Sequence, residues 1–183
     1  IISGDLSLRS RPMDRVIKPL TQMGAKILGR ESNSLAPLSI DGGNLQGISY
    51  SMPIASAQVK SAIILAALSG QGKTTIIEPN PSRDHTERMA KFMGGDIQIN
   101  ENSIVVTPST LKTNNITVPG DISSASTWIV AAICHPNAKI KIKNIGLNPT
   151  RTGSIEILKT MGAKLTIENN RIENGEPVGD IIA

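Results

Sequence analysis

The sequence predicts an α/β (α+β) fold made of repeated small α/β units. The first observation is a repeat. Three helix-like stretches end in Met-Gly and lead into a strand-like stretch, at Met23-Gly24, Met93-Gly94 and Met161-Gly162. Their spacing of roughly 70 residues is typical of one supersecondary unit copied along the chain. The second observation is that 39% of the residues are hydrophobic but only 2% are aromatic, which indicates a globular protein with an aliphatic core.

The composition also narrows the function. The 183 residues carry a formal net charge of +4 with both signs interspersed, which favours a small anionic ligand over nucleic acid. The single cysteine, Cys134, excludes a disulfide framework and favours a reducing, cytoplasmic compartment. The longest apolar runs are too short to cross a membrane, and we recognise no signal peptide. Since the chain starts at Ile1 and stops in an apolar segment, we expect a piece of a longer protein.

The chain is predicted to start with the tail of an earlier unit, a helix over residues 10–23 followed by a hairpin. Ser10 can cap this helix, and Pro12 suits its first turn. Gly24 then stands where a helix commonly ends in a left-handed residue.

The next unit should open with a helix over residues 56–68, which is apolar nearly all round and therefore expected to be buried. A strand over 74–78 follows, and a helix that starts at Ser82 or Asp84 ends before Gly94. Residues 97–99 and 104–107 then form a hairpin around Asn100-Glu101-Asn102.

The last unit repeats this order. A second apolar helix is predicted over residues 123–133, a strand over 139–144, and a helix from Thr152 to Gly162. Val118-Pro119-Gly120-Asp121 is the best candidate boundary between units, because Pro-Gly interrupts both strand and helix patterns. We therefore expect two parts, residues 1–117 and residues 118–183.

Several catalytic motifs are absent or misleading. Gly70-Gln71-Gly72-Lys73-Thr74 resembles the end of a phosphate-binding loop, but it follows a helix and precedes a strand, so a plain turn is favoured. The two histidines lie in different units, and no cluster has the spacing of metal ligands. No Ser-His-Asp site is indicated, since the adjacent Asp84 and His85 should point in different directions on a helix.

The remaining candidates are polar residues at the starts of helices, where free N–H groups suit phosphate and carboxylate. They are Arg11, Ser56, Gln58, Ser82, Arg83 and Asp121. Each serine could be a plain cap, Gln58 a solvated residue, and each arginine a surface ion pair. The combination of serines, glutamine and two arginines nevertheless indicates a small-anion site.

At these residues the chain resembles the 5-enolpyruvylshikimate-3-phosphate synthase family, also called 3-phosphoshikimate 1-carboxyvinyltransferase. The resemblance spans the whole chain and lies in four stretches: Ser10-Arg11-Pro12-Met13-Asp14-Arg15, Ser56-Ala57-Gln58-Val59-Lys60-Ser61-Ala62, Ser82-Arg83-Asp84-His85-Thr86-Glu87-Arg88 and Val118-Pro119-Gly120-Asp121-Ile122-Ser123-Ser124-Ala125. The Ser-Ala-Gln and Arg-Asp-His versions are similar to the glyphosate-tolerant bacterial class.

The resemblance implies a fold of two lobes, each made of three copies of a small α/β unit. It implies transfer of the enolpyruvyl group of phosphoenolpyruvate to the 5-hydroxyl of shikimate 3-phosphate, with release of phosphate and without a cofactor or metal. Arg11 then matches a phosphoenolpyruvate ligand. Ser56, Ala57, Gln58, Ser82 and Arg83 match the binding site of shikimate 3-phosphate, and Asp121 matches an aspartate at the hinge that faces the cleft.

The resemblance further implies that residues 1–117 are the latter part of one lobe and residues 118–183 are the hinge and first unit of the other. The family's Lys-Ser pair, catalytic aspartate and glutamate, and late lysine have no counterpart here. We therefore expect no catalytic residue within this segment and no activity from it alone. The full-length protein is expected to be a monomer that binds neither nucleic acid nor membrane, with glyphosate as an inhibitor.

Two alternatives stay open. The UDP-N-acetylglucosamine enolpyruvyl transferase shares the fold, but it usually has a reactive cysteine where this chain has Leu6. The other alternative is a non-catalytic repeat module that binds an anion.

Overall fold

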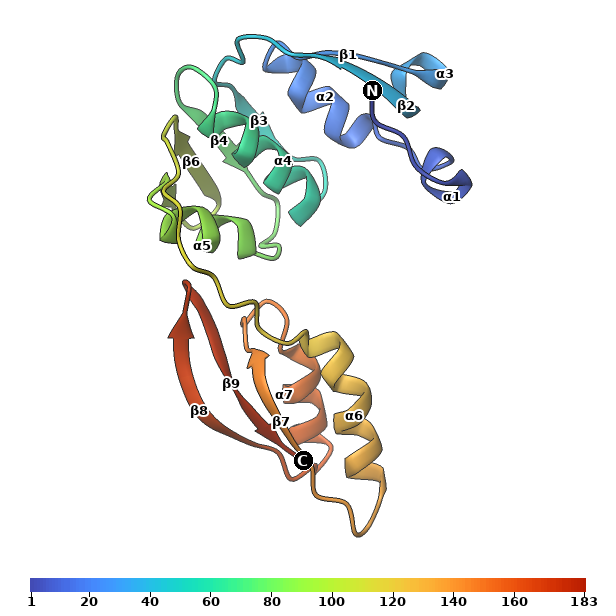
Figure 1. Ribbon diagram of the computed structural model, residues 1–183, viewed down its shortest axis with the longest axis vertical. Coiled ribbons are helices and arrows are strands. Elements are labelled where there is room, and N and C mark those ends of the chain that lie inside the picture. The colour runs from blue at the N-terminus through green and yellow to red at the C-terminus, as the bar shows by residue number, and fades with distance from the viewer. The chain divides into compact units, whose positions relative to one another are not determined.

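The computed structural model describes all residues from Ile1 to Ala183 and shows a mixed helix and strand fold, as predicted (Figure 1). The chain forms two compact units. Unit 1 comprises Ile1–Ser82 and Met93–Lys112, and unit 2 comprises Arg83–Phe92 and Thr113–Ala183. The predicted lobes, residues 1–117 and 118–183, concern the whole protein and stay a prediction.

Unit 1 begins with two helices and a hairpin. The elements are α1 (Leu6–Arg9), α2 (Asp14–Gln22), β1 (Lys26–Gly29), α3 (Arg30–Asn33) and β2 (Leu35–Asp41). The strands β1 and β2 pair antiparallel, so the hairpin predicted after Gly24 is confirmed. Met23 and Ile27 are buried between helix and hairpin, which explains why the repeat keeps apolar residues on either side of the glycine.

The predicted single helix over residues 10–23 is wrong at its start. Asp5 caps the short helix α1 by accepting a hydrogen bond from Leu8 N, and Ser10 ends α1 instead of starting α2. The physical reason is Pro12, because a proline disfavours the helical conformation of the residue before it, here Arg11. The helix α2 therefore begins at Asp14, and Arg11 lies in the turn between two helices.

The main sheet of unit 1 has four strands in the order β3-β4-β6-β5. They are β3 (Ser49–Ser51), β4 (Thr74–Ile77), β5 (Asp96–Ile99) and β6 (Ser103–Thr107). The helix α4 (Ala57–Leu68) packs on β4 and β6 and also contacts α2. Ile63, Ile76 and Val106 are fully buried where helix and sheet meet. The predicted elements at 56–68, 74–78, 97–99 and 104–107 are thereby confirmed.

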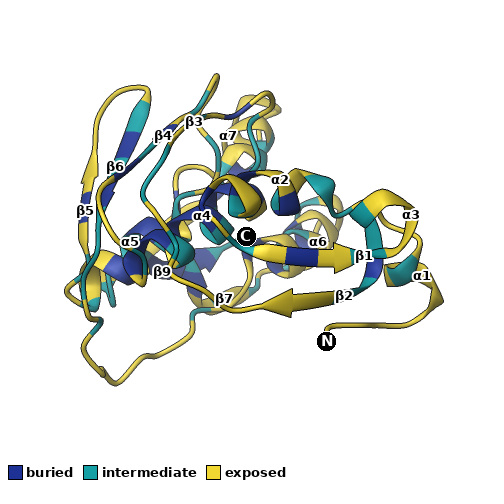
Figure 2. Cartoon of the chain, turned by 90° about the horizontal axis from the view of Figure 1, so that it is seen from above, coloured by how far each residue is buried: buried dark blue, intermediate teal, exposed yellow.

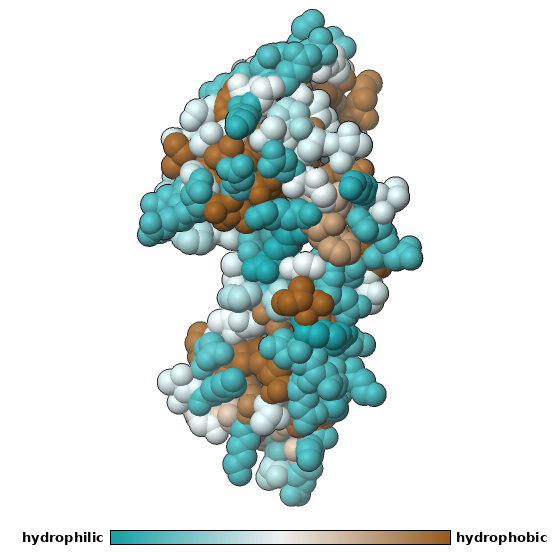
Figure 3. All heavy atoms as spheres, turned by 90° about the vertical axis from the view of Figure 1, so that its left-hand side faces the viewer, coloured by the Kyte–Doolittle hydropathy of each residue, from teal (hydrophilic) through white to brown (hydrophobic).

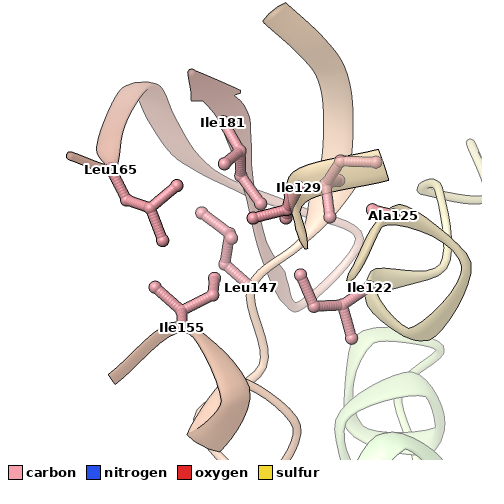
Figure 4. Close-up of a cluster of buried hydrophobic side chains, with 8 residues drawn as sticks. Ile122, Ala125, Ile129, Leu147, Ile155, Leu165 and Ile181 are labelled. Carbon is pink, nitrogen blue, oxygen red and sulfur yellow. The ribbon is translucent and has the colours of Figure 1, made fainter. Parts of the chain in front are cut away.

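Unit 2 has a three-stranded antiparallel sheet in the order β7-β9-β8, with α6 and α7 on one face (Figure 1). Its elements are α5 (His85–Phe92), α6 (Ile122–Cys134), β7 (Lys141–Gly146), α7 (Gly153–Thr160), β8 (Thr166–Glu173) and β9 (Glu176–Ile182). Figure 4 shows Ile129 of α6, Ile155 of α7 and Ile181 of β9 in one aliphatic cluster. This cluster needs no aromatic side chain, in agreement with the composition.

The repeat predicted from the sequence is confirmed by the strand pairing. The order β4-β6-β5 corresponds to β7-β9-β8, and in both copies the hairpin after the Met-Gly pair is antiparallel. Gly24, Gly94 and Gly162 have φ of 101°, 88° and 92°, a region that side chains rarely adopt. Each copy therefore uses glycine to turn from helix into hairpin.

The two helices that are apolar nearly all round were expected to be buried, but they are buried on one side only. Leu65 of α4 is 55% exposed and Trp128 of α6 is 68% exposed. In Figure 2, α6 carries yellow segments, which mark exposed residues. In Figure 3, brown patches mark hydrophobic residues at the surface. The strand predicted over residues 139–144 is also displaced, since β7 begins at Lys141 and ends at Gly146.

The sheet of unit 2 is irregular around Asp180, a buried residue of β9. Opposite it, β7 and β8 each shift register, and Asn144 and Asn169 there have positive φ. Asp180 accepts hydrogen bonds from Asn144 N at 3.0 Å and from Asn169 Nδ2 at 2.8 Å. One carboxylate thus fixes both irregular turns of the backbone.

Candidate functional site

In unit 1 the candidate anion-binding residues Ser56, Ala57 and Gln58 lie at the first turn of α4. Ser56 adopts an extended conformation and its Oγ accepts a hydrogen bond from Val59 N at 3.5 Å, as an N-cap should. Ala57 and Gln58 follow as the first helical residues, and Gln58 is exposed. The helix is long enough to concentrate positive potential at this end, where unpaired N–H groups remain.

Gln58 is held in place from a second helix. Its Oε1 accepts a hydrogen bond from an Nη of Arg15 of α2 at 2.9 Å. With the amide oxygen engaged, the Nε2 group remains as the donor that a ligand oxygen could meet. Arg15 was not singled out from the sequence, because its partner is more than 40 residues away and only the packing of α2 on α4 brings the two together.

Ser82 lies at the end of the loop after β4 and is tied to α4. Its Oγ donates to Glu78 Oε1 at 2.6 Å, and its carbonyl oxygen accepts from Lys60 Nζ at 3.4 Å. Lys60 Nζ also lies 2.9 Å from Glu78 Oε2. Lys60 and Glu78 were missed by sequence reasoning, although a lysine inside an otherwise apolar helix was a visible signal.

Arg11 lies in the turn between α1 and α2, and this turn is fixed by the hairpin. Arg30 donates to the carbonyl oxygens of Arg9 and Ala36, both at 2.8 Å. Met13 N, just beyond the turn, donates to Ser34 O at 2.7 Å. The side chain of Arg11 itself is exposed and makes no hydrogen bond or ion pair. The sequence predicted that Arg11 stands at the start of a helix. In the structure it extends instead from a turn that the hairpin holds in place.

In unit 2, Asp121 is the N-cap of α6. Its carboxylate accepts hydrogen bonds from the backbone N–H groups of Ser123 and Ser124, each at 3.2 Å, and lies 2.9 Å from an Nη of Arg151. The hydrogen bond from Ser123, with those from Ser124 and the charge of Arg151, lowers the pKa of Asp121 below its ordinary value. Arg151 also donates to Ser123 Oγ at 2.6 Å, so this helix start already holds a carboxylate and a guanidinium.

A cavity of about 240 Å³ adjoins this cap in unit 2. It is lined by side chains of α5, of residues 118–122 and of the segment after β7, including Asn148 and Arg151. Asn148 is 1% exposed, and its Nδ2 donates to Asp84 Oδ1 at 2.7 Å and to Glu176 Oε2 at 3.0 Å. The cavity is therefore bordered by a fully buried amide with two acidic partners.

The expectation that Asp84 and His85 point apart is wrong. His85 Nδ1 lies 2.7 Å from Glu176 Oε1 and 3.4 Å from Asn148 Nδ2, while Asp84 pairs with the same Asn148 and with Arg88. Burial alone would raise the pKa of Asp84, but the hydrogen bonds from Arg88 and Asn148 outweigh it and the pKa is lowered. Asp84 and His85 can both contact Asn148 because His85 begins α5 while Asp84 still lies in the loop before that helix.

Arg83 stands at the start of unit 2. It lies immediately before Asp84 and is exposed, and its guanidinium has no hydrogen-bond or ion-pair partner. Ser56, Ala57 and Gln58 share one helix turn, and Lys60 links that helix to Ser82. Arg83 and Asp121 belong to unit 2, each in its own surroundings.

Two further findings bear on chemistry. Across residues 1–183, no group of three or more histidine, cysteine, aspartate or glutamate side chains is arranged to hold a metal ion. None of the helices has the length and apolar character required to cross a bilayer.

Comparison with known proteins gives one consistent result. A protein from Gloeothece citriformis named 3-phosphoshikimate 1-carboxyvinyltransferase is 57% identical, over 98% of this chain and 41% of that protein. One with the same name from Thermodesulfovibrio yellowstonii is 54% identical, over 100% of this chain and 43% of that protein. The chain thus spans about two fifths of the length of these curated relatives.

Solved structures agree. The EPSP synthase of Acinetobacter baumannii superposes with a TM-score of 0.91 at 50% identity, covering 98% of this chain and 41% of that one. The enolpyruvyl transferase NikO from Streptomyces tendae shares the fold, with a TM-score of 0.69 at 16% identity, covering 94% of this chain and 42% of that one. The family model described as EPSP synthase (3-phosphoshikimate 1-carboxyvinyltransferase) matches residues 1–181, and the chain therefore belongs to the EPSP synthase family.

Proposed function

We propose that this chain forms part of an enzyme that transfers the enolpyruvyl group of phosphoenolpyruvate to the 5-hydroxyl of shikimate 3-phosphate and releases phosphate. Such an enzyme serves the shikimate pathway toward chorismate and the aromatic amino acids. Family membership supports the reaction, as does the name printed for the curated relatives. The observation that carries the proposal is the first turn of α4, where Ser56, Ala57 and a braced Gln58 present hydrogen-bond donors to an anion.

The proposed ligands of shikimate 3-phosphate are Ser56, Ala57, Gln58, Ser82 and Arg83. Ala57 would contribute its backbone N–H, and Arg83 a guanidinium that matches the oxygens of a phosphate. Arg11 is the proposed ligand of phosphoenolpyruvate, whose carboxylate and phosphate both suit a guanidinium fork.

Asp121 is a different case. In the structure its carboxylate is already engaged by the start of α6 and by Arg151. We assign it to the side of the hinge that faces the substrates, where its main task would be to hold that helix start.

The reaction is an addition followed by an elimination through a tetrahedral intermediate. It requires a proton for the methylene carbon of phosphoenolpyruvate and removal of a proton from the attacking hydroxyl. Before those proton transfers, the residues of this chain would orient the two anions and compensate their charge. The proton-transfer groups are expected elsewhere in the full-length protein.

Three finer points belong to the same proposal. We assign the protein to the cytoplasm, since its lone cysteine fits a reducing compartment. We expect the full-length protein to be a monomer. We also expect glyphosate to act as an inhibitor.

The test is an assay of phosphate release by the full-length protein. Release should require both shikimate 3-phosphate and phosphoenolpyruvate. Replacing shikimate 3-phosphate by UDP-N-acetylglucosamine addresses the other enolpyruvyl transfer, and release with that acceptor instead would reject the proposal. No release with either acceptor, but binding of phosphate compounds by titration, would favour an anion-binding module.

A further inference from the structure

Lys60 is a charged side chain in the core of unit 1. It lies one turn after Ser56 on α4, between the buried Val59 and Ile63, and is 1% exposed. Its partner Glu78, at 2.9 Å, has a side chain that is only 10% exposed. Removing two charges from water commonly costs more free energy than their attraction returns, so a buried ion pair is weak evidence of a stabilising role. The presence of the buried Lys60–Glu78 pair is therefore better explained by a role other than stabilising the fold.

Both members of the pair hold the same third residue. Glu78 uses its second oxygen to accept the hydroxyl of Ser82 at 2.6 Å. Lys60 uses its ammonium to donate to the carbonyl oxygen of Ser82 at 3.4 Å. Ser82 is therefore fixed by its side chain and by its backbone, and it is fixed against the helix whose first turn carries Ser56 and Gln58.

We propose that the Lys60–Glu78 ion pair is a positioning device for the binding of shikimate 3-phosphate, an inference that rests on the proposed function. The pair sets the distance between Ser82 and the first turn of α4, so that ligands from two separate segments present one surface. Neither Lys60 nor Glu78 needs to touch the substrate.

The pair also decides how Ser82 can bind. A carboxylate can only accept hydrogen bonds, so the hydroxyl proton of Ser82 is directed at Glu78. The free lone pairs of Ser82 Oγ are then available to a donor. Ser82 Oγ is thus oriented to accept, not to donate, a hydrogen bond from a ligand.

The test uses a double variant of the full-length protein, Lys60→Met together with Glu78→Met. Replacing both charges by apolar side chains of similar length removes the ion pair as a unit, so the variant should lose less stability than either single substitution. Binding of shikimate 3-phosphate, measured by titration, should weaken about tenfold, the loss of roughly one hydrogen bond to a charged or well-placed group. The kcat at saturating substrate should change little.

A cycle with Ser82→Ala separates positioning from general damage. If the pair acts through Ser82, the loss of affinity caused by Ser82→Ala should be smaller in the double variant than in the unsubstituted protein. The control is Lys26→Met with Asp41→Met, an exposed pair 3.9 Å apart on the first hairpin, which should bind normally.

A folded double variant with unchanged affinity would overturn the inference and leave the proposed function intact. If the unsubstituted protein fails to bind shikimate 3-phosphate, the proposed function is rejected, and the inference about the Lys60–Glu78 pair is rejected with it. Equal effects of Ser82→Ala in both backgrounds would show that the pair does not act through that residue.

Discussion

At the scale of single residues, the arginines fall into two groups. Arg15 and Arg151 are engaged by side chains of their own unit, Gln58 and Asp121. Arg11 and Arg83 are exposed, and their guanidinium groups have no hydrogen-bond or ion-pair partner. Substituting a side chain without partners should cost little folding stability, so effects of Arg11 and Arg83 variants on binding can be interpreted directly.

Gln58→Ala and Arg83→Ala should each weaken the binding of shikimate 3-phosphate to the full-length protein. A lost hydrogen bond to a charged group corresponds to roughly 1.5–3 kcal/mol, or about one to two decades in the dissociation constant. Isothermal titration measures this change, and Gln98→Ala on the exposed strand β5 serves as the control. Unchanged affinity in both variants would refute the assignment of these ligands.

Arg11→Lys should fold normally but lose much of its activity. An ammonium keeps the charge but cannot reproduce the planar fork that meets two oxygens at once. We expect a higher KM for phosphoenolpyruvate and an unchanged midpoint of thermal unfolding. Wild-type kinetics in this variant would show that Arg11 does not contact the substrate through its guanidinium fork.

The candidate residues were predictable from the sequence to different degrees. Ser56 could be predicted, because an N-cap depends on local sequence and Ser followed by an apolar run is a strong local signal. Arg15 and Lys60 could not, since their roles depend on partners on other elements. Arg11 was predicted to stand at a helix start, but it lies in the turn between α1 and α2, because Pro12 disfavours the helical conformation of the residue before it.

At the scale of elements, each repeat relies on a glycine with positive φ after its amphipathic helix. Hairpins and helices were predictable since their signals are local, and the Asn100-Glu101-Asn102 turn is a clear example. The exposed side of α4 and α6 could not be predicted, because the sequence does not show whether another segment covers an apolar residue such as Trp128. Periodicity identifies a helix, but the rest of the fold decides which sides are buried.

Gly162→Ala should lower the free energy of unfolding by about 1–2 kcal/mol, because alanine is strained at a φ of 92°. Gly153→Ala is the matched control in the same helix-and-turn segment. Gly153 begins α7, and open space surrounds the position of a new methyl group. That variant should be more stable by about 0.5 kcal/mol. Urea unfolding of both variants checks the pair, and the same sign for both would contradict the argument.

Asp180 predicts a pH dependence of stability. The hydrogen bonds from Asn144 and Asn169, with the ammonium of Lys141, lower the pKa of Asp180 to about 2 from 3.8. A carboxyl group with a lowered pKa in the folded state stabilises the fold above its unfolded pKa and loses this effect as the pH falls. Stability should therefore decrease between about pH 4 and pH 2.

The measurement is thermal unfolding of the full-length protein across that pH range. Asp180→Asn should unfold at a lower temperature near neutral pH and should show a flatter decline in acid. Asp96→Asn, at the exposed start of β5, is the control and should follow the unsubstituted protein. A decline in Asp180→Asn as steep as in the unsubstituted protein would exclude Asp180 as its source.

At the scale of the whole molecule, the chain carries two repeats and the helix and hairpin of an earlier one. Each repeat leaves apolar residues such as Leu65 and Trp128 exposed, as expected when one unit cannot bury its hydrophobic surface alone. The proposed ligands likewise bind and orient anions, and the proposed proton-transfer groups are expected elsewhere in the full-length protein. Both points fit a chain that spans about two fifths of its relatives.

The isolated 183-residue chain is therefore expected to lack transferase activity. The measurement is phosphate release with both substrates present, compared with the full-length protein at equal concentration. Release by the isolated chain that depends on both substrates would show that the proton-transfer residues lie within residues 1–183.

The path of the backbone through the two units has a practical consequence. The chain passes from one unit to the other after Ser82, after Phe92 and after Lys112. The helix α5 therefore belongs to unit 2, although the segments before and after it in the sequence belong to unit 1. A protease cut between Lys112 and Thr113 would leave α5 covalently attached to the first fragment, while Asn148 and Glu176 of the second fragment still bind Asp84 and His85 at the start of α5. Fragments cut there should co-purify, and separately expressed halves divided at that bond would form a natural split-protein pair.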